Sequence, residues 1–178
     1  MQSNLTEKQT LLRGKLEENN INPQSFLATD YLNHYNEVLM LIEMIPDMPE
    51  IFEEVKEWAP KSYCDHFRDS QFEARDLAIE AYGLSPSDFR ERFDDLVGQI
   101  DSQLLSAIEA LGELVEAGNE PQIRVATRSA LDSLHKITGS LNAVIHGEQT
   151  TLPQDAIDEL MEDADGGLSQ DDIDSLFD

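Results

Sequence analysis

The chain has little cysteine, few basic residues and no long apolar run, and each shortage excludes a class of protein. Cys64 is the single cysteine, so no disulfide can form within the chain, which fits a reducing compartment. The longest apolar run, residues 38–42, is far shorter than the about 20 residues that a membrane-spanning helix needs. Residues 1–10 are polar and lack the apolar segment of a secretory signal. We therefore expect a cytoplasmic protein without a membrane partner.

Positive charge is scarce. The sequence has 12 Lys and Arg against 37 Asp and Glu, which gives a formal net charge of −25. Nucleic-acid phosphates and anionic membrane surfaces would repel such a chain, so neither is an expected partner. A protein with a basic surface is compatible, because attraction between opposite charges would speed their encounter.

Strand patterns are also missing, since no window alternates apolar and polar side chains between turn signals. Helical periodicity is strongest over residues 85–146, where apolar side chains recur every three or four positions on either side of a short turn at residues 119–121. Two long helices joined by so short a turn should pack antiparallel. The sequence therefore predicts an all-α fold with a long antiparallel helical hairpin of the four-helix-bundle type, shorter helices packed on it and a flexible acidic C-terminal tail.

Three parts are expected along the chain. Residues 1–22 carry a weak leucine stripe and are predicted to form a mobile N-terminal helix. Residues 23–147 form the all-helical domain that contains the hairpin. Residues 148–178 form the acidic tail, with two docking peptides at residues 152–161 and 168–177.

Capping signals set the expected helix boundaries. Thr29 is expected to cap one helix, Pro49 to open a short one, and Ser62 to cap another that continues to a stop at Gly83. Ser85 precedes a proline and is predicted to cap the first long helix of the hairpin.

The tail carries one pattern twice. Residues 168–177 combine an S-x-x-D capping box with apolar residues on one helical face, and they align without a gap with residues 152–161. Each copy is shorter than the about 12–15 residues that an isolated helix needs in water, which suits a peptide that folds in another protein's groove. Two acidic helical turns that cap the fold are the alternative interpretation, but packing does not account for the repeat. The residues expected to contact a partner are Leu168, Ser169, Gln170, Ile173, Leu176 and Phe177 in the second copy and Ile157 and Leu160 in the first.

Asp95 and Gln99 are one pair in the hairpin that could act on a phosphoryl group. They stand at positions i and i+4 and share one face of the predicted helix, off the apolar stripe. An amide there can orient a water for in-line attack on an acyl phosphate, while a carboxylate engages a cation of the partner. From the spacing alone, a solvated polar pair is the simpler interpretation.

His135 is the second candidate. The register of the helix places it outside the apolar stripe, with the small residues Gly139 and Ser140 one turn later. An exposed histidine can accept a phosphoryl group on a ring nitrogen, and small neighbours leave a partner room to approach. A plain surface histidine is the simpler interpretation here too.

Two glycines are expected at one level of the hairpin. A turn centred on Asn119 places Gly98 level with residue 140, beside Gly139. Each glycine inside a helix costs about 1 kcal/mol relative to alanine. The pair therefore suggests either close helix packing or a surface cleared for a partner, within about two turns of the candidate side chains.

Two stretches resemble proteins of bacterial chemotaxis. Residues 168–177 are similar to the peptide with which flagellar motor switch proteins of the FliM kind capture the phosphorylated response regulator CheY, and a related peptide ends the CheZ-like response-regulator phosphatases. Residues 93–99, F-D-D-L-V-G-Q, resemble the CheZ active-site stretch F-Q-D-L-T-G-Q. The resemblance implies that Gln99 positions the water and that Asp95 pairs with a lysine of the regulator. Since CheZ hairpins dimerise, it also leaves open a homodimer through the hairpin.

The resemblance implies a chemotaxis or flagellar signalling protein that binds a CheY-like receiver through its C-terminal peptide and hydrolyses the receiver's aspartyl phosphate. No cofactor is expected in this chain, and Mg²⁺ is expected on the partner receiver. No metal site is predicted, since Cys64 and His66 have no second pair at ligand spacing. A non-enzymatic adaptor that binds a receiver is one alternative. The other is phosphotransfer through His135, because residues 135–140 resemble the H-x-x-K-G-S segment of histidine phosphotransfer domains, with Thr138 in place of the lysine.

Overall fold

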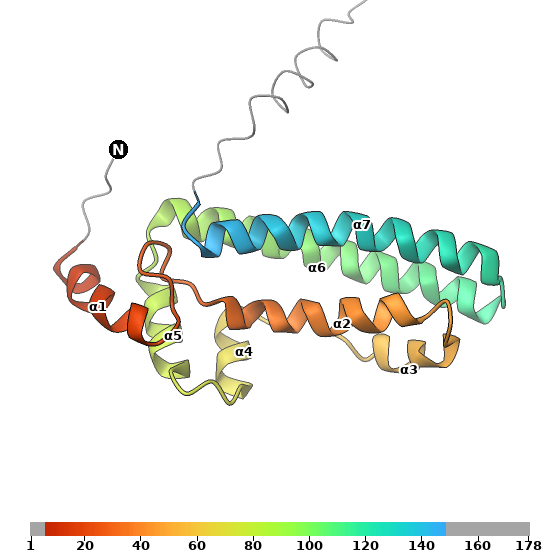
Figure 1. The fold of residues 1–178 in the computed structure, drawn as a ribbon, viewed down its shortest axis with the longest axis horizontal. Coiled ribbons are helices and arrows are strands. Elements are labelled where there is room, and N and C mark those ends of the chain that lie inside the picture. The colour runs from red at the N-terminus through yellow and green to blue at the C-terminus, as the bar shows by residue number, and fades with distance from the viewer. Residues whose placement is uncertain (1–5, 149–178) are drawn as a thin grey trace, which may run out of the picture. The chain divides into compact units, whose positions relative to one another are not determined.

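The computed structural model describes residues 6–148 and has seven α-helices, two short 3-10 helices and no strand within that range (Figure 1). The predicted all-α fold is confirmed. Among the described helices, none is both long enough and apolar enough to span a membrane.

The predicted hairpin is also confirmed. Helix α6 (Ser87–Glu116) and helix α7 (Glu120–Ile145) run side by side in opposite directions (Figure 1). Gly118 ends α6 with a φ of +64°, a left-handed conformation that glycine adopts without steric cost. Asn119 then caps α7, because its side chain accepts a hydrogen bond of 3.3 Å from the backbone N–H of Gln122.

Apolar side chains spaced at three or four residues close the hairpin, as the periodicity predicts. Burial of this stripe is the main favourable contribution to the packing of the two helices. Its buried members are Phe89, Phe93, Ile100, Leu104 and Leu111 on α6 and Ile123, Leu134, Ile137, Leu141 and Val144 on α7, and the polar Thr127 is buried with them.

A third helix packs on the hairpin. The 3-10 helix η1 (Thr29–Leu32) leads into α2 (Asn33–Met44), which lies along the hairpin (Figure 1). Arg124 on α7 forms a 3.2 Å ion pair with Asp47, just beyond α2. The described residues thus place three helices together, and the four-helix-bundle part of the prediction is not confirmed.

A proline and a serine begin two of the helices between residues 45 and 84. Pro49 opens the 3-10 helix η2 (Pro49–Ile51), which continues into α3 (Phe52–Val55). Ser62 caps α4 (Tyr63–Asp69), since its side chain accepts a hydrogen bond from the backbone N–H of Asp65. Both starts agree with the sequence.

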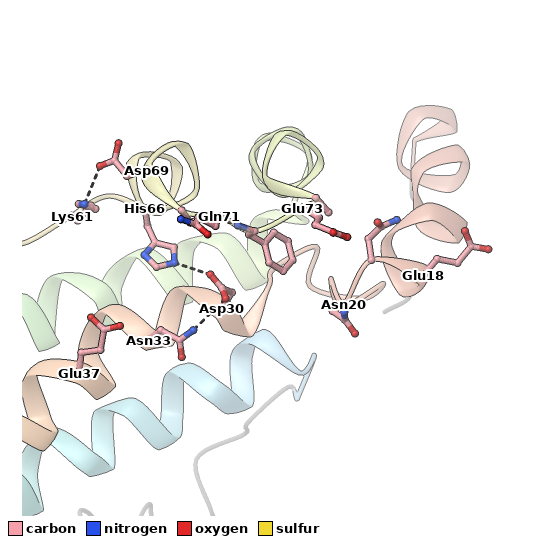
Figure 2. Close-up of a pocket in the computed structure, with 14 residues that line it drawn as sticks. Glu18, Asn20, Asp30, Asn33, Glu37, Lys61, His66, Asp69, Gln71 and Glu73 are labelled. Carbon is pink, nitrogen blue, oxygen red and sulfur yellow. Dashed lines mark hydrogen bonds and ion pairs between the residues drawn. The ribbon is translucent and has the colours of Figure 1, made fainter.

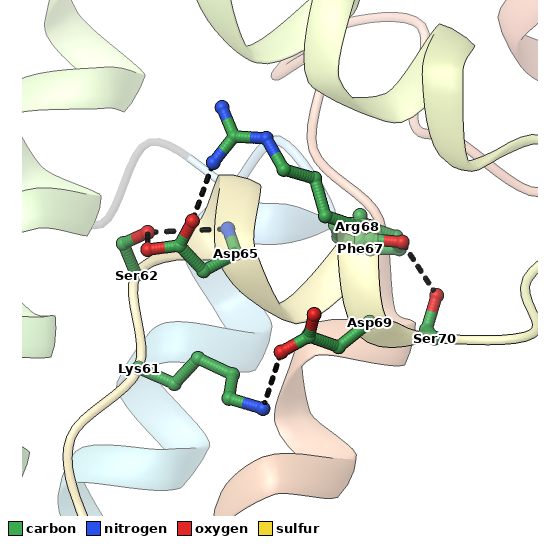
Figure 3. Close-up of polar contacts among 7 residues, drawn as sticks. All are labelled: Lys61, Ser62, Asp65, Phe67, Arg68, Asp69 and Ser70. Carbon is green, nitrogen blue, oxygen red and sulfur yellow. Dashed lines mark hydrogen bonds and ion pairs between the residues drawn. The ribbon is translucent and has the colours of Figure 1, made fainter.

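The prediction of one continuous helix from Ser62 to Gly83 is wrong, because the chain breaks after α4 and α5 (Arg75–Gly83) is separate. Ser70 is extended, and its hydroxyl donates a 3.1 Å hydrogen bond to the carbonyl of Phe67 (Figure 3). The same hydroxyl accepts one of 3.2 Å from the backbone N–H of Phe72. These local bonds replace helical ones. Gly83 is the last residue of α5 rather than a residue beyond its end.

Two exposed ion pairs accompany α4. Lys61 and Asp69 are 2.9 Å apart, and Arg68 pairs with Asp65 one turn earlier on the helix (Figure 3). Pairs this exposed contribute little to the free energy of unfolding. They orient α4 locally and do not account for its stability.

The prediction that Ser85 caps α6 is wrong. Pro86 occupies the cap position, where no side chain caps the helix. The Ser85 hydroxyl instead donates a 2.7 Å hydrogen bond to the carbonyl of Ser25, and the Ser25 hydroxyl donates to the carbonyl of Ile145. All of these groups are buried, so this serine pair joins the start of α6 to the end of α7.

Helix α1 (Glu7–Glu18) starts with a capping box, in which Thr6 and Gln9 exchange hydrogen bonds. Its Leu12 and Leu16 are buried, whereas Leu11 is 78% exposed. The Gln9 side chain also donates a 2.8 Å hydrogen bond to the carbonyl of Leu84, next to α5. The predicted leucine stripe therefore contributes two residues to the core.

Candidate functional site

Asp95 and Gln99 lie on the solvent side of α6. They share a shallow depression with Gly98, Ser102 and Gln103, and all five residues are exposed. Gln99 stands two residues before Asp101, which accepts a hydrogen bond from α2, so Gln99 faces away from that helix. A carboxylate and an amide one turn apart are thus open to a partner.

Gly98 in the same depression has no packing role in the described structure. A Cβ built on Gly98 meets no atom within 4 Å, and the same holds for Gly139 on α7. Close packing of the hairpin therefore does not explain either glycine. Of the two interpretations of the glycines, a surface cleared for a partner is the one that agrees with this space.

One hydrogen bond sets the register of the hairpin beside the site. The Ser133 hydroxyl donates to Oε1 of Gln103 over 2.7 Å. Residues preceding Gln103 on α6 therefore lie level with residues following Ser133 on α7. The register expected from a turn centred on Asn119 agrees with this bond to within about two residues, or half a helical turn.

His135 does not share the face of Asp95 and Gln99. It follows Ser133 by two residues, which turns it about 160° away from the side that meets Gln103. It stands eleven residues after Arg124, close to three full turns, and Arg124 reaches Asp47 beside α2. His135 is exposed on that side of α7. The two candidate sites lie at similar levels of the hairpin but on different faces.

Asp94 is engaged within the chain, although it is a direct neighbour of Asp95. It accepts a 2.7 Å hydrogen bond from the Tyr82 hydroxyl and lies 3.9 Å from Arg90. The Arg90 guanidinium also stands over the Tyr82 ring, 5.1 Å from its centroid. Burial, and then the bond with Asp94, raises the pKa of Tyr82 to about 12. This cluster ties the first turns of α6 to α5 and leaves Asp95 facing solvent.

A second polar cluster anchors α6 on its other side. The hydroxyl of Tyr35 donates a 2.9 Å hydrogen bond to Asp101, and the hydroxyl of Tyr31 lies 3.1 Å from that of Tyr35. Tyr31 donates in turn to the carbonyl of Lys61 over 2.8 Å. Burial raises the pKa of Tyr31, Tyr35 and Asp101. The two tyrosines thus hold Asp101, two residues from Gln99, a contact between distant segments that no local sequence pattern indicates.

A larger cavity of about 690 Å³ lies between the end of α1, the start of α2 and residues 61–74 (Figure 2). Its walls carry more acidic than basic side chains. The two basic side chains that line it are engaged, since His66 lies 3.0 Å from Asp30 and Lys61 lies 2.9 Å from Asp69. Within residues 6–148, no group of three or more metal-binding side chains comes together. This cavity therefore presents no unengaged cation to a phosphoryl group.

The remaining predicted contacts cannot be placed on this geometry. Both docking peptides, residues 152–161 and 168–177, lie outside the described residues. Comparison with protein-family models, with curated proteins and with solved structures finds no match for the chain.

Proposed function

We propose that this chain binds a CheY-like receiver through the peptide at residues 168–177 and hydrolyses the receiver's aspartyl phosphate at Asp95 and Gln99. The proposal places it among CheZ-like chemotaxis proteins, on the resemblance of residues 93–99 and 168–177. The observation that carries the catalytic part is the exposed depression in which Asp95, Gly98 and Gln99 lie together.

Hydrolysis requires little of this chain except side chains in the correct positions. Hydrolysis of an acyl phosphate needs a water in line with the bond that breaks and a partner held still, and it needs no covalent step on this protein. The Gln99 amide would orient the water, and the Asp95 carboxylate would engage the receiver's lysine. Mg²⁺ would belong to the receiver. Neither Asp95 nor Gln99 is tied up by an ion pair or a side-chain hydrogen bond in residues 6–148, so both are available for these tasks.

Tethering fits an open site of this kind. A peptide that holds the receiver raises its local concentration at the hairpin, so weak contacts around Asp95 and Gln99 suffice for turnover. The experiment is dephosphorylation of the cognate receiver by the wild type and by Gln99→Ala. Loss of turnover is expected in the variant, and equal rates would remove the catalytic part of the proposal.

A non-enzymatic adaptor is the alternative in which only the tail acts. Deleting residues 166–178 should abolish receiver binding under either proposal. If Gln99→Ala and Asp95→Ala bind the receiver and leave its dephosphorylation unchanged, the adaptor is favoured. If the deletion variant keeps its affinity, both proposals lose their binding site.

Phosphotransfer through His135 is favoured by a separate observation. His135 is exposed, and Gly139 one turn later has no atom within 4 Å of a Cβ built on it. A receiver could therefore approach the imidazole. An acid-labile label on the protein that disappears in His135→Gln would support this function, and the absence of label from every cognate kinase would remove it.

A further inference from the structure

We propose that Lys136 contacts the phosphoryl group during hydrolysis, supplying from α7 the positive charge that α6 lacks at the site. This inference rests on the proposed function, since it concerns the same substrate at the same depression. It adds a residue outside the two stretches, residues 93–99 and 168–177, on whose resemblance the proposed function rests.

Lys136 stands where this acidic chain has few basic residues, and like Arg128 it has no ion pair within residues 6–148. It is the only Lys or Arg that follows Arg128 in the sequence. It is exposed, and it forms none of the ion pairs found in residues 6–148. Structural charge pairing within the described part of the chain therefore does not account for it. An uncommitted cation at this point of the surface is available to an anionic group of a partner.

The hairpin register brings Lys136 level with Gln99. The Ser133 hydroxyl lies 2.7 Å from the Gln103 side chain, which shows how the two helices are aligned. Lys136 is three residues beyond Ser133, one turn further along α7, while Gln99 is four residues before Gln103. Because the helices are antiparallel, these two steps run in the same direction. Each step is about one turn of 3.6 residues, so both side chains stay on the side of the hairpin marked by the Ser133 bond.

The lysine can reach the space in front of the amide. Axes of packed helices are about 8–10 Å apart, and lysine places its ammonium on a flexible four-carbon stem. The depression is lined by the α6 residues Asp95, Gly98, Gln99, Ser102 and Gln103, so Lys136 would approach it from the α7 side. The ammonium and the Gln99 amide can therefore meet one group that is seated in the depression from outside.

The negative charge of the transferring phosphoryl group explains why hydrolysis would use Lys136. A water oxygen attacks the phosphorus, the bond from phosphorus to the receiver's aspartyl oxygen breaks, and inorganic phosphate and a free carboxylate leave. Negative charge on the equatorial oxygens must be stabilised while this happens. Asp95 is itself anionic and cannot do so. In this step Lys136 contributes charge alone and transfers no proton.

The test compares Lys136→Met with Lys136→Arg in the full chain. Arg128→Met is the matched control, because it removes the same charge from an exposed position of α7 eight residues earlier, rotated about 80° from Lys136. We expect kcat for receiver dephosphorylation to fall about tenfold in Lys136→Met, since donors at transition-state oxygens have large effects on turnover. Lys136→Arg should restore most of it. Arg128→Met should match the wild type.

A binding measurement separates phosphate contact from general attraction. Lys136→Met should weaken binding to a receiver loaded with beryllium trifluoride, a phosphoryl mimic, and leave binding to the unloaded receiver unchanged. If Lys136→Met keeps full turnover while Gln99→Ala loses it, the role of Lys136 is refuted and the proposed function stands. If Gln99→Ala also keeps full turnover, the proposed function fails and the role of Lys136 fails with it.

Discussion

Replacing Gly98 by alanine should make the protein more stable and less active. Gly98 lies inside α6, where glycine costs about 1 kcal/mol relative to alanine. Because a Cβ at this position meets no atom within 4 Å, the substitution adds no steric cost in the folded chain. The free energy of unfolding should therefore rise by about 0.5–1 kcal/mol, which corresponds to a Tm increase of roughly 1–4 °C for a chain of this size.

The same methyl group should hinder the partner. It would project into the depression between Asp95 and Gln99, where the receiver is proposed to dock. A misplacement on the order of 1 Å at a reacting centre can cost about 100-fold in rate, so a loss of about tenfold or more in dephosphorylation is expected. Stability and activity would then change in opposite directions, which general damage to the fold cannot produce.

Gly112→Ala is the matched control on the same helix. A Cβ there would lie 2.9 Å from Cζ of Phe52, so the ring must shift and the stability gain should be lost or reversed. Urea denaturation and receiver dephosphorylation are measured for both variants. Unchanged dephosphorylation by Gly98→Ala would show that the open space around Gly98 does not receive the partner. A lower free energy of unfolding would show that other atoms cover the position.

Three further predictions follow from the site and its supports. Asp95→Asn should raise KM for the phosphorylated receiver more than it lowers kcat, because its proposed role is to engage a cation of the partner; steady-state kinetics that show only a kcat change would contradict that role. Tyr35→Phe should lower the free energy of unfolding by about 1–2 kcal/mol in urea denaturation, since it leaves the half-buried Asp101 without its donor. Burial, aided by the nearby His66, lowers the pKa of His34 to about 4 from 6.5, so the unfolded chain binds more protons between these values. Stability should therefore fall on acidification through that window, on the order of 1–2 kcal/mol, and His34→Gln should flatten this dependence.

Periodicity and turn chemistry account for the parts of the fold that the sequence predicts. Stripes of apolar residues on α6 and α7 repeat over many turns, so single exceptions do not alter their direction. Gly118 and Asn119 carry strong stop and start signals in adjacent positions. Exposure of Asp95, Gln99 and His135 follows from their place outside those stripes.

Features that depend on contacts distant in sequence were not predictable in the same way. Ser85 is an acceptable helix cap by local rules, but its hydroxyl bonds to Ser25, sixty residues away. The break at Ser70 is local, because its hydroxyl bonds to the backbone of Phe67 and Phe72, but the apolar pattern over these residues does not reveal it. That Lys136 lies level with Gln99 follows only once the bond between Ser133 and Gln103 is known, because that bond shows which sides of the two helices adjoin.

The most direct measurement is the rate at which the cognate phosphorylated receiver loses its phosphoryl group in the presence of wild type, Gln99→Ala or Gln122→Ala. Gln122 is the matched control, since it carries the same amide at an exposed position in the first turn of α7 and does not line the depression. The proposed function predicts that wild type and Gln122→Ala accelerate dephosphorylation and that Gln99→Ala returns the receiver to its intrinsic rate. Equal acceleration by all three proteins would contradict it.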